Sequence, residues 1–194
     1  MVPASRSGVI TSVDERRLVG LACAADVVLR SDARLGDYVP EGAPLLEVLG
    51  DPGALDVAAV AGCVLQARDR TMQDDVAFGF RQLVDIAERA LSTGVNDPTT
   101  AVQAMDELHD LLRRLATRPL RSGVHLDDQG AVRLLLPAER LDDFLALALD
   151  EIEHYGSEDL QVQHRLGALL DDVASAALPE HRRAVEERQA RRSQ

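Results

Sequence analysis

The side chains best suited to binding or catalysis in this sequence lie between residues 70 and 100. Arg70 and Arg81 carry guanidinium groups that can clamp a carboxylate or phosphate, or pair with acids of the same chain. Arg81 lies four residues before Asp85, a spacing that places both side chains on one helix face. We therefore expect an ion-pair network that also includes Asp75, and a substrate clamp at the two arginines is the alternative.

A second polar cluster, Asn96-Asp97-Pro98-Thr99-Thr100, opens a helical pattern. Asp97 directly before Pro98 is a typical N-cap, and Asn96 tolerates the backbone of a tight turn. The same helix N-terminus, with the hydroxyl of Thr99, could instead hold a small ligand or an anion, or contact a partner. The candidate ligand-binding residues are Arg70, Thr71, Arg81, Asn96, Asp97 and Thr99.

Motifs for catalysis, metal binding or nucleotide binding do not occur in the sequence. Ser92 lies outside any G-x-S-x-G turn, and His109 has the setting of a partly exposed helical histidine. His154 and His164 are ten residues apart and form no metal-binding motif. Neither G-x-G-x-x-G nor a P-loop is present. We therefore predict no catalytic residue, no metal and no cofactor.

The composition favours a globular domain that does not bind nucleic acid. Of the 194 residues, 46% are apolar, and the formal net charge is −12. This charge repels a phosphate backbone, and aromatic residues, at 3%, offer bases little surface for stacking. The sequence contains no lysine, which excludes a Schiff base and a biotinyl or lipoyl attachment. Two distant cysteines, Cys23 and Cys63, fit a reducing compartment and predict a cytosolic location.

An α+β fold must position these side chains, and it begins with a small β-rich unit over residues 1–52. Short β-branched segments at 9–13 and 27–29 predict strands, and one helix follows Asp14. The turn over residues 36–45 has the sequence Gly-Asp-Tyr-Val-Pro-Glu-Gly-Ala-Pro-Leu. It resembles the turn of barrel-sandwich hybrid domains, the fold of biotinyl and lipoyl carriers. Because the attachment lysine is missing, this resemblance implies the fold alone.

Residues 53–194 are expected to form a mainly helical domain with one β-hairpin. Apolar residues at helical spacing predict helices over 76–91, 102–115, 141–155 and 162–173. The hairpin is expected over residues 121–137. We expect Ser157 to cap the helix that follows it, and the tail beyond Pro179 to be a solvated or frayed helix.

One ordered set of residues, the signature, carries a family resemblance. It comprises Arg70-Thr71, Asp75, Phe78-Gly79, the segment 81–87, Ala90-Leu91-Ser92 and the segment 96–101. The signature resembles the soluble C-terminal domain of DUF2254, a bacterial family of predicted integral membrane proteins of unknown function. The resemblance extends over nearly the whole chain. It implies that membrane-spanning helices precede this domain in relatives, at the inner face of the cell membrane.

Three classes of function are compatible with these patterns. The leading hypothesis is a non-catalytic cytosolic sensor or interaction domain, and the long apolar stripes predict a homo-oligomer. The alternative is a small-molecule-binding protein or enzyme with a pocket near Arg70, Arg81 and Asn96-Asp97. A third interpretation assigns the signature to helix capping and packing alone. Burial with mutual hydrogen bonds would favour the structural interpretation, and an exposed apolar patch would favour a partner.

Overall fold

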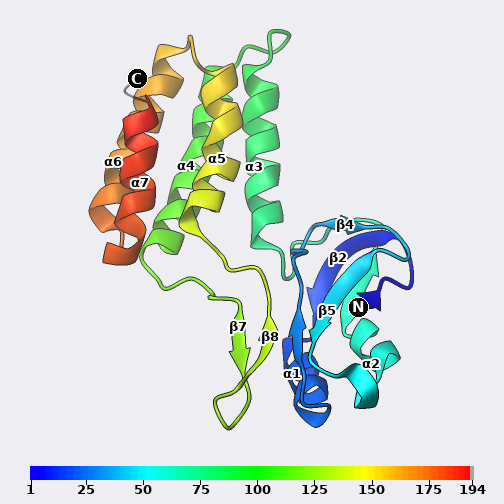
Figure 1. Cartoon of the computed structure of the whole chain (residues 1–194). Helices are drawn as coiled ribbons and strands as arrows, with labels where there is room; N and C mark the ends of the chain where they lie inside the picture. The colour runs from blue at the N-terminus through cyan, green and yellow to red at the C-terminus, as the bar shows by residue number, and fades with distance from the viewer. Residues whose placement is uncertain (193–194) are drawn as a thin grey trace. The chain divides into compact units, whose positions relative to one another are not determined.

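The computed structural model describes residues 1–192 and has an α+β fold (Figure 1). The chain forms two compact units. The first comprises residues 1–78 and 121–139, and the second comprises residues 79–120 and those from 140 onward. The first unit holds all the strands of the described chain, and the second is helical. The predicted fold class, β-rich at the N-terminus and mainly helical afterwards, is confirmed.

A five-stranded sheet with the order β1-β5-β3-β8-β7 forms one part of the first unit. Its strands are β1 (Val2–Pro3), β5 (Pro44–Leu49), β3 (Val28–Arg30), β8 (Val132–Leu135) and β7 (Val124–Leu126). Neighbouring strands are antiparallel except β3 and β8, which are parallel and place Leu29 opposite Leu134. Both leucines are fully buried. The β7–β8 hairpin therefore completes a sheet that begins at the N-terminus.

A three-stranded antiparallel sheet, with the order β4-β2-β6, forms the other part of the first unit. Its strands are β4 (Tyr38–Val39), β2 (Gly8–Val13) and β6 (Val64–Ala67). The accompanying helices are α1 (Glu15–Ala24), the 3-10 helix η1 (Pro52–Ala54) and α2 (Val57–Ala61). Asp14 caps α1, as expected, by accepting the Arg17 N–H at 3.0 Å. Buried side chains of both sheets and of α1 and α2 form one apolar core.

The first unit continues beyond residue 52, where the sequence pattern placed a boundary. Residues 64–67, within the segment that was expected to be mainly helical, form β6, which pairs with β2. The hairpin lies where it was predicted, but its strands join the sheet of the first unit. Pairing between distant segments causes both differences, because local patterns do not encode it.

The second unit is built from α3 (Val76–Leu91), α4 (Pro98–Ala116), α5 (Leu141–Tyr155), α6 (Leu160–Ala176) and α7 (Pro179–Arg192). α4 packs against α5 and α6, and α7 packs against the same two helices. Phe80 on α3 lies 5.3 Å from Phe144 on α5, measured between ring centroids. The bounds of α3 and α5 match the predicted helices, because their apolar stripes face one common core.

Two details at the C-terminal end correct the expectations. Asp159, rather than Ser157, caps α6, since its carboxylate accepts two first-turn N–H groups at 2.9 and 3.0 Å. α7 is packed rather than frayed, because Val185 is fully buried and Arg188 is 6% exposed. Arg188 donates to Glu153 of α5 at 2.6 Å. This ion pair allows a strongly charged helix to pack on the bundle.

Candidate functional site

Arg70 lies shortly after β6 and is held by residues that follow it. Its Nε and Nη2 donate to Oδ2 of Asp75 at 2.9 and 2.7 Å. Asp75 is 4% exposed, and its Oδ1 accepts the Phe78 N–H at 2.9 Å in the first turn of α3. The guanidinium also lies 5.0 Å from the centroid of the Phe78 ring, which is a cation–π contact. Arg70 therefore anchors the start of α3.

Gly36 leaves the space that the Arg70 guanidinium occupies. The φ of Gly36 is +87°, and a Cβ there would lie 2.7 Å from Nε of Arg70 and closer still to the rest of the group. Glycine thus permits both the left-handed backbone and the close approach. The turn over residues 36–45 and the start of the signature therefore meet in space. Thr71, next to Arg70, is exposed.

Arg81 on α3 is the centre of a separate ion-pair cluster. Its Nη1 donates to Glu151 of α5 at 2.7 Å, and its Nε donates to Asp85 at 2.6 Å. Glu88 lies 3.4 Å from Nη2. These contacts raise the pKa of Arg81, the bond to Glu151 most of all, and the same bond lowers the pKa of Glu151. The predicted pair with Asp85 is confirmed, and the bond to Glu151 ties α3 to α5.

Asn96 and Asp97 form the turn between α3 and α4. Asn96 has a φ of +48°, in the left-handed region that asparagine adopts more readily than most residues. Asp97 accepts the Thr100 N–H at 3.1 Å and the Thr100 hydroxyl at 2.6 Å. These bonds, the one to the hydroxyl first, lower the pKa of Asp97. The predicted N-cap is confirmed, and Thr99 is exposed in the same turn.

The structure divides the candidate residues between separate places. Arg70 and Thr71 belong to the first unit, whereas Arg81, Asn96, Asp97 and Thr99 belong to the second. Within the second unit, Arg81 lies ten residues before Leu91, the last residue of α3, or about 15 Å along the helix axis. Asn96 lies beyond that end, so it does not share a site with Arg81. Ligand binding by these residues stays a prediction.

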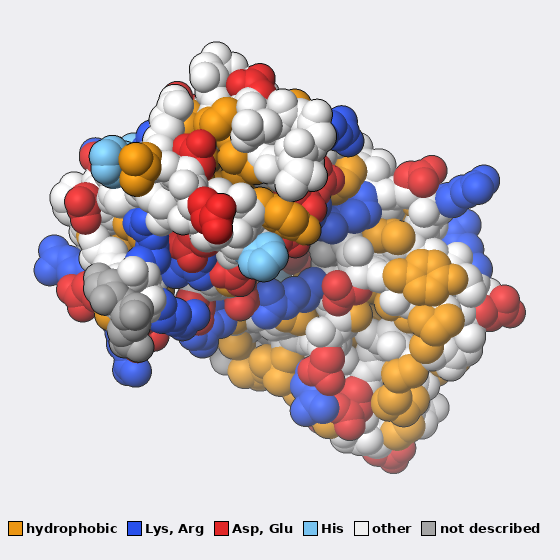
Figure 2. All heavy atoms as spheres, turned by 90° about the horizontal axis from the view of Figure 1, so that it is seen from above, with side chains coloured by type: hydrophobic (Ala, Val, Ile, Leu, Met, Phe, Trp, Pro, Cys, Tyr) orange, Lys and Arg blue, Asp and Glu red, His pale blue; other side chains and the backbone are white. Residues whose placement is uncertain are grey.

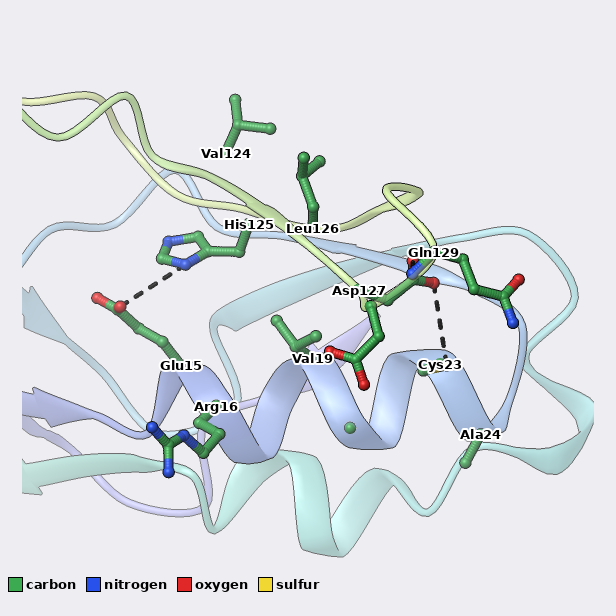
Figure 3. A pocket seen from close by; sticks show the side chains of 12 residues that line it. Glu15, Arg16, Val19, Cys23, Ala24, Val124, His125, Leu126, Asp127 and Gln129 are labelled. Atoms are coloured by element: carbon green, nitrogen blue, oxygen red, sulfur yellow. Dashed lines mark hydrogen bonds and ion pairs between the residues drawn. The ribbon is translucent and has the colours of Figure 1, made fainter.

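A groove that the sequence patterns did not indicate lies between α1 and the β7–β8 hairpin (Figure 3). It is open and has a volume of about 1110 Å³. Residues 15–24 on α1 form one wall, and residues 124–129 form the other. The groove exists only because β8 pairs with β3, which brings the hairpin onto a sheet formed by much earlier residues. The hairpin pattern was the one available signal.

Charged contacts fix both ends of this groove. At one end, His125 Nδ1 lies 3.6 Å from Glu15, and Arg121 donates to the same carboxylate at 3.1 Å. At the other end, Arg133 donates to Asp127 at 2.8 Å and to Asp26, which follows α1, at 2.9 Å. The bond from Arg133 is the main cause of the lowered pKa of Asp127. The hairpin is therefore held in a defined position over α1.

Residues 1–192 show no group of three or more His, Cys, Asp or Glu side chains that is arranged to hold a metal ion. Within the same range, no helix is both long enough and apolar enough to cross a membrane.

Comparison with known proteins identifies one family and several relatives. The family model described as "Predicted membrane protein (DUF2254)" matches residues 1–172. Uncharacterized proteins of Mycobacterium bovis and Mycobacterium tuberculosis are each 33% identical to this chain over 192 residues. The match covers 94% of this chain but 36% of each relative, so the chain spans about a third of their length. No solved structure matches it.

Proposed function

The chain belongs to the DUF2254 family of predicted membrane proteins, and from this premise we propose that it is a non-catalytic sensor or interaction domain at the cytoplasmic side of a membrane. It would act through contacts with other proteins, including further copies of itself. The longer relatives have room for a membrane part, since the matched region is 36% of their length.

The observation that supports this proposal most is that the charged residues of the signature bond to other residues of the same chain. Arg70 is bonded to Asp75, Arg81 is bonded to Glu151, and Asp97 caps α4. Groups that would have to bind a substrate are thus engaged in holding helices in place. The signature is better explained by folding than by chemistry.

Surface composition and the two cysteines add support. Hydrophobic side chains reach the surface in patches between charged ones (Figure 2). Exposed examples on the first unit are Tyr38 at 66%, Leu65 at 54% and Leu126 at 53%. Cys23 and Cys63 are both free thiols, the state that a reducing cytoplasm maintains. An interaction role on the cytoplasmic side fits both features.

A thermal-unfolding screen tests the proposal against ligand binding. The chain is heated with divalent metals, nucleotides and anionic metabolites, and the interaction role predicts an unchanged melting temperature with each. A ligand at a hundred times its Kd would add about 2.7 kcal/mol, a shift of several degrees. A shift of that size that is lost in Arg70→Ala or in Asn96→Gly would refute the proposal and establish a binding site.

Asn96→Gly and Asn96→Ala together separate the two roles of this side chain. Glycine keeps the positive φ of +48° and removes only the amide, whereas alanine also strains the turn. A purely structural Asn96 therefore predicts near-native stability for Asn96→Gly and lower stability for Asn96→Ala.

A further inference from the structure

The strand β7 ends the five-stranded sheet and presents a free edge. Two of the other sheet ends are blunted. β1 contains Pro3, which has no N–H, and on β6 the carbonyl of Gln66 accepts the guanidinium of Arg6. β7 contains no proline, so its edge can offer backbone N–H groups to another strand.

The backbone of β7 directs two residues away from its partner β8. The Leu136 N–H donates to the Gly123 carbonyl at 2.8 Å, and the Asp127 N–H donates to the Ala131 carbonyl at 2.9 Å. In an antiparallel pair, alternate residues direct their backbone N–H and carbonyl groups to the same neighbouring strand. The N–H and carbonyl groups of Val124 and Leu126 therefore point outward, away from β8. The outward N–H of Val124 has a local acceptor, the Ser122 hydroxyl, at 3.2 Å.

The side chains of the same two residues are exposed. Val124 is 45% exposed and Leu126 is 53% exposed, and both point away from α1 in Figure 3. The strand is also well fixed, because Asp127 accepts two backbone N–H groups of the turn at 2.9 Å. At Gly123, whose φ is +73°, any Cβ would collide with the Leu136 carbonyl. A rigid, apolar edge of this kind is suited to pairing with another strand.

The charges on either side of β7 have opposite signs. Arg121, which is 70% exposed, precedes the strand, and Asp127 and Asp128 follow it. Asp128 is exposed and forms no hydrogen bond or ion pair with the other described residues. A second copy in antiparallel orientation would bring Arg121 of each copy, which also donates to Glu15, toward Asp128 of the other; Asp127 is already bonded to Arg133. A parallel copy would bring like charges together.

We propose that two copies of this chain associate through β7, antiparallel and centred on His125. In this register, Val124 of one copy lies opposite Leu126 of the second copy. The Leu126 N–H donates to the Val124 carbonyl, and the Val124 N–H exchanges the Ser122 hydroxyl for the Leu126 carbonyl. The two five-stranded sheets become one continuous sheet. This inference rests on the proposed interaction function and names the partner. Because β7 has only three residues, the free domain associates weakly.

Sedimentation over a wide concentration range tests the pairing with two matched variants. Leu126→Lys places a charge on the β7 edge and is expected to raise the dimer Kd by about tenfold or more. Leu65→Lys changes a leucine of almost equal exposure, 54%, on β6, and is expected to leave the Kd unchanged. A chain that stays monomeric at all concentrations, or a dimer equally sensitive to both variants, would overturn the proposal.

Exchanging the charges at positions 121 and 128 gives a test whose expected result, restored association, cannot arise from loss of folding. Arg121→Glu and Asp128→Arg are each expected to weaken the dimer, and the double variant is expected to restore it. If the double variant is weaker than either single one, the antiparallel pairing is wrong. Melting temperatures of all three variants verify that each is folded.

A cysteine at the symmetry centre tests the register. In the proposed dimer, His125 lies opposite His125 of the second copy in a non-hydrogen-bonded pair, about 4.5 Å apart at Cα, a separation suited to a disulfide. His125→Cys in a Cys23→Ser background is expected to cross-link on mild oxidation, and Leu65→Cys in the same background is not. Equal cross-linking of both would refute the register. The ligand screen above is independent of these results, so failure of the pairing and failure of the interaction role are distinguishable.

Discussion

Replacing Gly36 by alanine tests whether the turn over residues 36–45 and the signature depend on each other. Alanine at a φ of +87° strains the backbone by about 1–2 kcal/mol. Its Cβ also displaces the Arg70 guanidinium, which is bonded twice to the buried Asp75. Loss of a hydrogen bond to a charged group costs about 1.5–3 kcal/mol. We therefore expect Gly36→Ala to lower the free energy of unfolding by roughly 2.5–5 kcal/mol.

Gly42 provides the matched control. Its φ is +80°, close to that of Gly36, but a Cβ there would meet nothing within 4 Å. Gly42→Ala should therefore show the backbone strain alone, about 1–2 kcal/mol. The difference between the two alanine variants isolates the contact with Arg70.

Urea unfolding followed by tyrosine fluorescence measures these changes. The chain has two tyrosines and no tryptophan, so Tyr155→Phe leaves Tyr38 as the reporter of the first unit. In an Arg70→Ala background, Gly36→Ala should cost no more than Gly42→Ala does. An equal cost of Gly36→Ala with and without Arg70 would refute the reasoning, because it would show that the two side chains do not interact.

Three further predictions concern the helical unit. The pKa of Asp97 lies below its ordinary value of 3.8 because Thr100 donates to the carboxylate. The charged cap therefore stabilises the folded unit above that pH, and this stabilisation is lost as the pH falls through the lowered pKa. Asp97→Asn should flatten the acid side of a stability–pH profile. Arg81→Met should destabilise the unit by about 1 kcal/mol, and a double-mutant cycle with Glu151→Gln should show coupling between the two residues in urea unfolding. Leu108→Ala removes a fully buried side chain of α4 and should lower the free energy of unfolding by about 2–5 kcal/mol, measured in the same way.

Local patterns predicted the helices of the second unit well. The spacing of apolar residues located α3 and α5, and Asp97 before Pro98 marked the start of α4. These features depend on residues within one or two turns of each other. β6 and the parallel pairing of β3 with β8 depend on partners far away in the sequence, so local spacing could not reveal them.

The contacts of the candidate site residues also divide into local ones, which the sequence predicted, and distant ones, which it did not. The cap at Asp97 and the pair of Arg81 with Asp85 were predictable, because each involves residues three or four positions apart. The partner of Arg81 on α5, the space beside Gly36 for Arg70, and the groove beside α1 arise from tertiary packing. The sequence indicated contacts between residues close to each other along the chain but could not indicate contacts between distant ones.

The parallel pairing of β3 with β8 also has a consequence for synthesis on the ribosome. Leu29 pairs with Leu134, so the edge of β3 that pairs with β8 has no partner strand until 105 further residues have been synthesised. At 5–20 residues per second, this delay lasts roughly 5–20 seconds. During that time, the nascent chain exposes a strand edge and the buried face of Leu29. Fragments that end before residue 121 keep that edge open permanently, so they should aggregate, whereas the chain through residue 139 can close its first unit.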